Sequence, residues 1–183
     1  MGTRVQRGAG ERGFTLLEML VVLAIIGIVT AGVLLSLNLT GHDPALTTAS
    51  RRLVSLMRYA REQAELETRD YGIVFDARGY QFAVFSERRN EWHKATRDTT
   101  LRPRRLPPGL HLTVIVDGRK VKLHAGPQSD PSALAPQVVL YSSGDLSSFE
   151  VTLERPRTHD GFLIKPNRDG HIVEQRLGQA HKP

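Results

Sequence analysis

Two long stretches of this chain carry apolar residues in two different patterns. Residues 19–41 contain no Asp, Glu, Lys or Arg, so this run is apolar on every side of a helix. About 20 apolar residues span a bilayer as a helix, and we therefore expect a membrane-spanning helix over residues 14–39. The next stretch is apolar on one side only, because these residues recur at helical spacing: Leu46, Ala49, Leu53, Leu56, Met57, Ala60 and Ala64.

The boundary between the two patterns lies at Gly41-His42-Asp43-Pro44. Gly41 can end one helix, Asp43 can cap the N-terminus of the next, and Pro44 suits its first turn. We therefore predict an amphipathic helix over residues 44–68 that packs its apolar stripe on a sheet. Three charged pairs four residues apart support its exposed side: Arg58/Glu62, Arg61/Glu65 and Glu65/Arg69.

Alternating apolar residues after this helix predict a first hairpin, with strands over 71–75 and 80–84 and a turn over 76–79. Trp92 follows, and we expect it to cap the apolar face of this hairpin. Residues 97–109 hold four arginines and three prolines and are predicted to form a basic loop.

Further short strands are predicted through the rest of the chain. A strand over 110–116 turns at Asp117-Gly118 and returns with Val121 and Leu123. The later strands are expected at residues 137–142, 149–153, 161–165 and 171–177. The pattern indicates an α+β fold: a long N-terminal helix packed on a domain of short antiparallel strands over residues 70–177, in two small sheets.

The residues before the apolar run are basic, with Arg4, Arg7 and Arg12 against Glu11. By the positive-inside rule this flank stays cytoplasmic, which places residues 40–183 across the membrane, in the periplasm of a Gram-negative cell. A cleaved secretory signal would have a shorter apolar core and a small-x-small cleavage site. A plain signal anchor explains the length of the run but not Glu18, because a charge in hydrocarbon costs about 2.5–3.5 kcal/mol.

Glu18 therefore needs a partner in apolar surroundings. A cut between Gly13 and Phe14 would create an α-amine four residues before Glu18, on the same subunit or on a neighbour. Their pairing would cancel two charges inside a filament core and would set the register between subunits.

The stretch Gly13-Phe14-Thr15-Leu16-Leu17-Glu18 and the apolar run after it resemble the class III leader and N-terminal helix of type IV pilins and type II secretion pseudopilins. The resemblance implies that prepilin peptidase removes residues 1–13, that Phe14 becomes the N-methylated first residue, and that Glu18 recruits and aligns subunits. Leu35 stands where many major pilins have proline, so their helix kink is not predicted here.

A second resemblance covers most of the chain and is carried by core aromatic residues and turn glycines. Its residues are Ala60-Arg61-x-x-Ala64, Asp70-Tyr71-Gly72-x-x-Phe75, Gly79-Tyr80-x-Phe82, Trp92, and Ser143-Gly144-Asp145 with Phe149. They are similar to the minor pseudopilin H family (GspH) of type II secretion and to its relatives, the FimT-type minor type IV pilins. For the aromatic residues themselves, core packing is the favoured role.

The resemblance implies a structural subunit in the tip region of a short periplasmic pseudopilus that supports export of folded proteins. Its implied partners are other minor and major pseudopilins, prepilin peptidase, the inner-membrane assembly platform and a secreted substrate. The implied location is the bacterial inner membrane, crossed once, with residues 40–183 in the periplasm. The alternative is a FimT-like minor type IV pilin that acts in pilus assembly or DNA uptake.

Composition and motifs give no support to an enzyme or a cofactor protein. The 183 residues include no cysteine, and the seven histidines are scattered without the spacing of metal ligands. Ser143, His159 and Asp160 lack the sequence context of a hydrolase, and turn chemistry explains Ser143 better. We therefore expect no catalytic residue, no metal and no cofactor.

The net charge of +6 leaves nucleic-acid binding to be considered. The arginines of residues 97–105 could contact phosphates, and so could Lys165, Arg168 and Arg176 near the C-terminus. These cations are not interleaved with aromatic residues as in single-strand binders. A solvated surface is therefore favoured over a nucleic-acid contact.

Overall fold

The computed structural model describes residues 16–39, 43–126, 134–158 and 160–177 of the chain. The backbone separates into two compact units, Met1–Gly41 and His42–Pro183, and each is described by itself.

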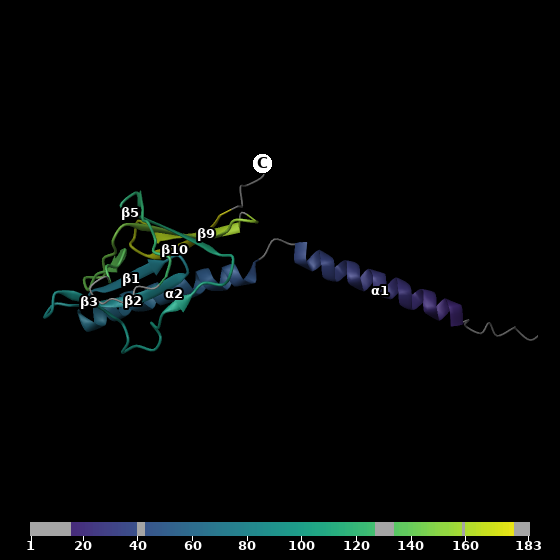
Figure 1. Cartoon of the computed structure of the whole chain (residues 1–183), viewed down its shortest axis with the longest axis horizontal. Coiled ribbons are helices and arrows are strands. Elements are labelled where there is room, and N and C mark those ends of the chain that lie inside the picture. The colour runs from purple at the N-terminus through teal and green to yellow at the C-terminus, as the bar shows by residue number, and fades with distance from the viewer. Residues whose placement is uncertain (1–15, 40–42, 127–133, 159, 178–183) are drawn as a thin grey trace, which may run out of the picture. The chain divides into compact units, whose positions relative to one another are not determined.

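The first unit consists of one continuous helix, α1 (Leu16–Leu39), of 24 residues (Figure 1). The helical backbone runs through position 35, where the sequence predicted no kink. Every side chain described in α1, from Leu16 to Thr30, is exposed. Within the part of the chain whose side chains the structure describes, no helix is both long enough and apolar enough to cross a membrane.

The second unit begins with helix α2 (Pro44–Glu67), which starts at the predicted residue and ends one residue before the predicted end. The Asp43 carboxylate accepts a hydrogen bond from the Leu46 N–H at 3.0 Å and so caps the N-terminus. At the other end Thr68 adopts a left-handed conformation (φ 51°) and donates its N–H to the Ala64 carbonyl. The buried residues of α2 contain the whole predicted apolar stripe, together with Ser50 and Val54.

The first sheet has the strand order β3-β2-β1-β7, and a short β4 also pairs with β2. All its pairings are antiparallel, and β1 and β2 form the predicted hairpin with Ile73 opposite Phe82. The strands are β1 (Tyr71–Asp76), β2 (Gly79–Ser86), β3 (Glu91–Lys94), β4 (Arg104–Arg105) and β7 (Val138–Leu140).

The second sheet has the strand order β10-β9-β8-β5-β6 and is also antiparallel. Its strands are β5 (His111–Val116), β6 (Arg119–Lys120), β8 (Phe149–Arg155), β9 (Asp160–Pro166) and β10 (Ile172–Leu177). The α+β class with two small antiparallel sheets is therefore confirmed.

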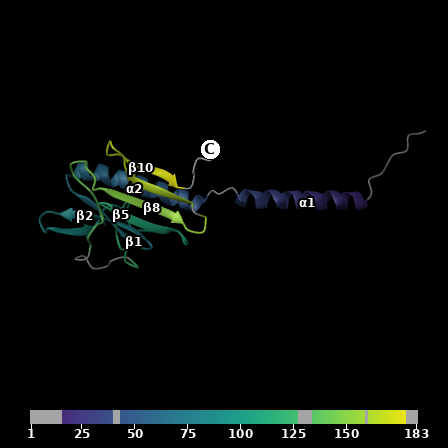
Figure 2. The same ribbon diagram turned by 90° about the horizontal axis from the view of Figure 1, so that it is seen from above.

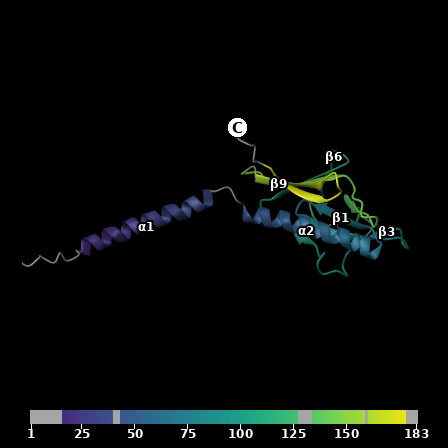
Figure 3. The same ribbon diagram turned by 180° about the vertical axis from the view of Figure 1, so that it is seen from behind.

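Helix α2 packs on both sheets, against β1 and β7 of the first and against β8, β9 and β10 of the second (Figure 2, Figure 3). Leu53 and Met57 of α2 are fully buried in one core with residues from both sheets, including Phe82, Val151 and Ile164. This shared core is what joins the two sheets into one unit, because neither sheet could cover its own apolar face.

Three details of the strands differ from the sequence prediction. The predicted basic loop contains β4, which pairs with the start of β2. The return strand after Asp117-Gly118 is limited to Arg119 and Lys120, so Val121 and Leu123 lie outside it.

Trp92 lies in β3, opposite Phe85, and packs beside Val74 and Ala83. These residues lie on the face of the hairpin that points away from the main core. The prediction that Trp92 caps the main apolar face was wrong, because alternation along β3 directs it to the other side.

The predicted charge pairs on α2 are only partly present. Arg61 lies 3.4 Å from Glu65, as predicted. Arg58 instead donates two hydrogen bonds to the Ile172 carbonyl, at 2.7 and 3.2 Å, and Arg69 lies 3.7 Å from Glu67. The backbone carbonyl of Ile172 thus takes the place of the predicted partner of Arg58, the surface carboxylate of Glu62.

Candidate functional site

The candidate processing and assembly site lies at the N-terminus of the chain. Gly13 and Phe14 are outside the described residues. Glu18 lies in the first turn of α1, where the positive end of the helix dipole favours a carboxylate, and its side chain is exposed. The apolar side chains around it are also exposed; Leu16, for example, is 80% exposed. An apolar surface of this extent is stable when lipid or other apolar helices cover it.

Two glycines of the family-like pattern allow close packing in the first sheet. A Cβ atom on Gly72 would lie 2.5 Å from Cβ of Pro136 and 2.9 Å from the Trp92 ring. A Cβ atom on Gly79 would lie 2.0 Å from the Arg104 carbonyl oxygen, so only glycine lets β4 pair there. Both glycines therefore have a structural role.

The Ser143-Gly144-Asp145 turn packs against α2. Gly144 has a φ of 86°, and a Cβ atom on it would lie 2.9 Å from Oε1 of Glu65. The Ser143 hydroxyl donates to the Asp145 carboxylate at 2.9 Å. These contacts explain Ser143 by turn geometry. His159, which the sequence placed beside Asp160 as a nominal triad member, is outside the described residues.

The three candidate nucleic-acid contacts near the C-terminus do not form one surface. Arg176 lies 3.2 Å from Asp160, with its guanidinium 6.0 Å from the centre of the Phe162 ring. Arg176 pairs with Phe162 across β9 and β10, and Lys165, three residues from Phe162, points to the opposite face of the sheet. Arg168 lies in the turn between these strands.

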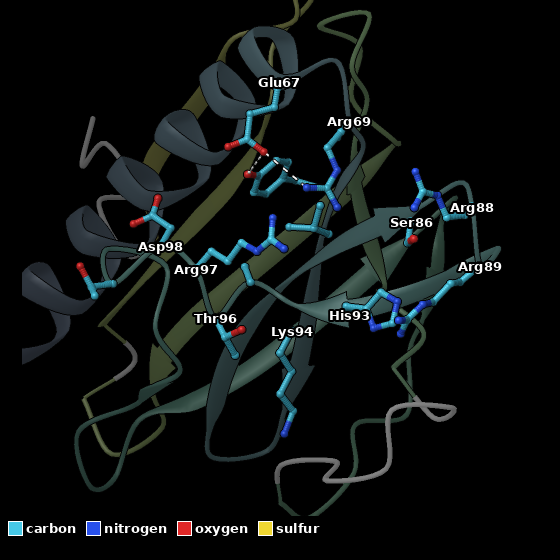
Figure 4. Close-up of a pocket in the computed structure, with 14 residues that line it drawn as sticks. Glu67, Arg69, Ser86, Arg88, Arg89, His93, Lys94, Thr96, Arg97 and Asp98 are labelled. Atoms are coloured by element: carbon cyan, nitrogen blue, oxygen red, sulfur yellow. Dashed lines mark hydrogen bonds and ion pairs between the residues drawn. The ribbon is translucent and has the colours of Figure 1, made fainter.

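A groove with a volume of about 1020 Å³ opens beside the C-terminal end of α2 (Figure 4). Its walls come from three segments: the end of α2, the β2–β3 hairpin and residues 94–99. Buried Tyr71, Val84 and Ala95 also line it. We call it the basic groove, because its charged lining residues are Arg69, Arg88, Arg89, Lys94 and Arg97 against Glu67 and Asp98.

The two carboxylates of the basic groove are already engaged. Glu67 accepts a hydrogen bond from the Tyr71 hydroxyl at 3.0 Å; burial and this bond raise the pKa of Tyr71 to about 12. Asp98 accepts a hydrogen bond from the Thr100 N–H at 2.7 Å. Burial raises the pKa of Asp98, but hydrogen bonds from Tyr59 and Thr100 outweigh burial and hold the pKa below its ordinary value.

The structure offers no metal site among the residues it describes, where no three His, Asp or Glu side chains converge.

The basic groove was not predicted from the sequence. Its cations lie in three separate segments, and each segment alone has the pattern of an ordinary exposed turn or loop.

Comparison with protein families gives two matches to this chain. Residues 9–34 match the prokaryotic N-terminal methylation motif, and residues 49–170 match the type II transport protein GspH. The first match includes Gly13, Phe14 and Glu18, and the second covers most of α2, the whole first sheet and the second sheet except β10.

Curated relatives agree with these matches over nearly the whole chain. The type II secretion system protein H of Pseudomonas aeruginosa is 31% identical over 87% of this chain and 92% of its own length. The protein of the same name from Aeromonas hydrophila is 29% identical over 88% of this chain and 92% of its length.

Solved structures share the fold. The minor pseudopilin EpsH from the type 2 secretion system of Vibrio cholerae superposes with a TM-score of 0.58 at 21% identity, over 77% of this chain and all (100%) of that one. The solution structure of Escherichia coli GspH gives a TM-score of 0.53 at 17% identity, over 79% of this chain and 99% of that one.

Proposed function

This chain belongs to the GspH family and is a minor pseudopilin of type II secretion. We propose that residues 14–39 assemble the filament and that residues 40–183 contact the partners. The observation that carries the proposal is the combination, in one chain, of a methylation motif at residues 9–34 and a GspH domain at residues 49–170. The secretion-system relatives favour this role over that of a FimT-like type IV pilin.

The methylation motif and the family indicate a pseudopilin anchored by its N-terminus. In our proposal prepilin peptidase removes residues 1–13, and Phe14 becomes the methylated first residue. Residues 14–39 then hold the subunit in the inner membrane, with the leader on the cytoplasmic side, until extraction into the filament. The exposed apolar side chains of α1 support this, because both lipid and neighbouring helices would cover them.

Glu18 has the assembly role in this proposal. Its carboxylate pairs with the α-amine of Phe14, on the same subunit or on an adjacent one, once the leader is gone. The position of Glu18 in the first turn of α1 supports the pairing, because the new N-terminus would begin only four residues earlier. In an apolar filament core an ion pair of this kind favours one register over others.

Residues 40–183 form the periplasmic domain in this proposal, with helix 44–68 and the β domain 70–177 as one body. The domain meets other minor and major pseudopilins in the tip region, the assembly platform and, during export, the secreted substrate. It acts as a structural subunit and not as an enzyme. The shared core of α2 and the two sheets supports a rigid scaffold that presents its loops to partners.

Mass spectrometry of the mature protein, together with secretion by a complemented deletion strain, tests the proposal. The protein should start at Phe14, carry one methyl group on its α-amine and restore export of the secreted protein. An intact Met1, or a cut beyond Ala31, would contradict the processing step. Correct processing without restored export would contradict the secretion role.

A further inference from the structure

The basic groove contains cations that have no partner among the residues the structure describes. Arg69 lies 3.7 Å from Glu67 and reaches the Phe85 carbonyl at 3.4 Å, and Arg89 lies 3.9 Å from Glu91. By contrast, no hydrogen bond or ion pair of the described residues involves the side chains of Arg88, Lys94 or Arg97. Figure 4 shows Arg97 reaching from its loop toward the middle of the groove, with Arg88 on the hairpin across from it.

This arrangement differs from a solvated basic surface in two respects. The cations come from three short segments between residues 69 and 97 that line one hollow, so folding concentrates them. The carboxylates of Glu67 and Asp98 accept hydrogen bonds from Tyr71 and Thr100 and make no ion pair with Arg88 or Arg97 among the described residues, and four arginines outnumber them in the lining. The groove is therefore complementary to an anionic ligand.

We propose that the basic groove binds an extended acidic segment of a protein partner, whose Asp or Glu side chains pair with Arg88 and Arg97. A volume of about 1020 Å³ is far larger than a single phosphate needs, and Figure 4 shows Arg88 and Arg97 on different sides of the groove. Arginine is suited to the task, because its planar guanidinium can bind a carboxylate through two hydrogen bonds.

The edge of the first sheet favours a peptide as the occupant. Among the described residues β3 pairs only with β2, so its other edge has no neighbouring strand. His93 and Lys94 of β3 both line the groove, but His93 lies opposite Val84 on its face of the sheet, whereas the Lys94 side chain extends away from the middle of the groove (Figure 4). An extended peptide can use such an edge for main-chain hydrogen bonds while its side chains reach the cations.

The aromatic residues argue against single-stranded nucleic acid in this groove. Among the described residues of its lining, Tyr71 alone has a phenylalanine, tyrosine or tryptophan ring, and this ring is 3% exposed and bonded to Glu67. Trp92 packs on the opposite face of the sheet. Bases therefore find no platform on which to stack.

Fluorescence anisotropy with the full chain in detergent micelles tests the proposal. The probe is a labelled ten-residue peptide of alternating Glu and Gly, and its matched control replaces Glu with Gln. We expect binding of the Glu peptide that weakens with added salt, and about a tenfold larger Kd for the double variant Arg88→Glu/Arg97→Glu. The variant Arg88→Lys/Arg97→Lys should bind with an affinity between those of the parent and the charge-reversed variant, because lysine keeps the charge but not the two-point hydrogen bonding.

The control for net charge is the double variant Arg51→Glu/Arg168→Glu, which reverses two exposed arginines outside the groove. Its Kd should stay within about twofold of that of the parent protein, because distant surface charges are screened by salt. Trp92 fluorescence during thermal unfolding verifies that each variant is folded. If Arg88→Glu/Arg97→Glu does not fold, Arg88→Gln/Arg97→Gln takes its place in the same comparison.

Equal Kd values for the Glu and Gln peptides would overturn the proposal, and so would an equal rise in Kd for both charge-reversal variants. Binding of a ten-nucleotide thymidine strand or of inorganic phosphate at the same two arginines, tighter than that of the Glu peptide, would also overturn it. The proposal does not rest on filament assembly. The variant Glu18→Leu should therefore bind the Glu peptide normally, even if export fails.

Discussion

Nε of Arg155, at the end of β8, donates a hydrogen bond to Oδ2 of Asp43, the N-cap of α2. The other oxygen of the same carboxylate accepts the Leu46 N–H at 3.0 Å. One side chain thus caps the helix and ties its first turn to the second sheet. Burial raises the pKa of Asp43, but the bonds from Arg155 and Leu46 outweigh burial and hold the pKa below its ordinary value of 3.8.

Replacing Asp43 should therefore weaken the folded domain. We expect Asp43→Ala to lower the free energy of unfolding by about 1–3 kcal/mol, because it removes the cap and leaves Arg155 without its carboxylate. Urea unfolding followed by Trp92 fluorescence measures the loss. Thr48→Ala, at an exposed position one turn later on the same helix, is the control and should change stability by less than about 0.5 kcal/mol.

The same carboxylate gives a prediction for acid conditions. Its folded-state pKa is lowered, so its contribution is fully present above the unfolded pKa near 3.8 and is lost as pH falls through the lower folded value. The melting temperature of Asp43→Asn should consequently depend less on pH below about 4 than that of the parent protein. If the melting temperatures of the two proteins fell equally with pH below about 4, the contribution assigned to Asp43 would be wrong.

The two sides of this contact differ in how far the sequence could predict them. Asp43 directly precedes a proline, lies two residues after Gly41 and stands ahead of an apolar stripe, so local pattern alone identifies it as a cap. Arg155 lies 112 residues away, and no local pattern connects it to Asp43. In general, the elements that depend on neighbouring residues were predictable here, and the contacts that depend on topology were not.

The strand β4 shows the same limit. Residues 97–109 have the prolines and arginines of a loop, and Arg104 and Arg105 pair with β2 only because Gly79 leaves room for them. The basic groove was missed for a related reason, since folding brings Arg69, Arg88 and Arg97 together from segments that are individually unremarkable.

The close approach at Gly79 leads to a prediction about stability. Gly79→Ala should destabilise the domain by about 1–3 kcal/mol, because the new methyl group would meet the Arg104 carbonyl oxygen at 2.0 Å. Chemical denaturation of the variant measures the change. The matched substitution Gly126→Ala meets nothing within 4 Å and should be close to neutral. Equal effects at the two positions would show that β4 does not pack as described.

The apolar stripe of α2 allows a paired test on one helix. Leu53 is fully buried between the sheets, whereas Leu66 is 76% exposed. Leu53→Ala should cost about 3–5 kcal/mol through lost burial and an unfilled cavity. Leu66→Ala should cost less than about 0.5 kcal/mol. Unfolding curves of both variants give the comparison, and a large effect at Leu66 would indicate that another surface covers it.

Tyr71 and Tyr80 should remain protonated well above pH 10. Burial is the main cause of the raised pKa of each tyrosine, which lies at about 12. The hydrogen bond to Glu67 and its negative charge add to the rise at Tyr71. A raised pKa stabilises the fold below the unfolded value near 10, and this contribution is lost as pH rises from 10 toward 12. Absorbance at about 295 nm should show a tyrosine component titrating late, reduced in Tyr71→Phe and in Tyr80→Phe. Complete ionisation at about pH 10 in a folded protein would refute the burial of these rings.

Glu18 provides the sharpest test of the assembly role. Glu18→Leu keeps the run apolar and removes only the carboxylate, so membrane insertion and cleavage after Gly13 should persist. Export should fall by at least about tenfold if the carboxylate aligns subunits through the Phe14 amine, since an unpaired amine would remain in apolar surroundings. Glu18→Asp keeps the charge but shortens the side chain, and partial export by that variant would point to charge pairing. Membrane fractionation, mass spectrometry of the N-terminus and assay of the exported protein separate the steps. Normal export by Glu18→Leu, with correct processing, would show that register is set elsewhere in the filament.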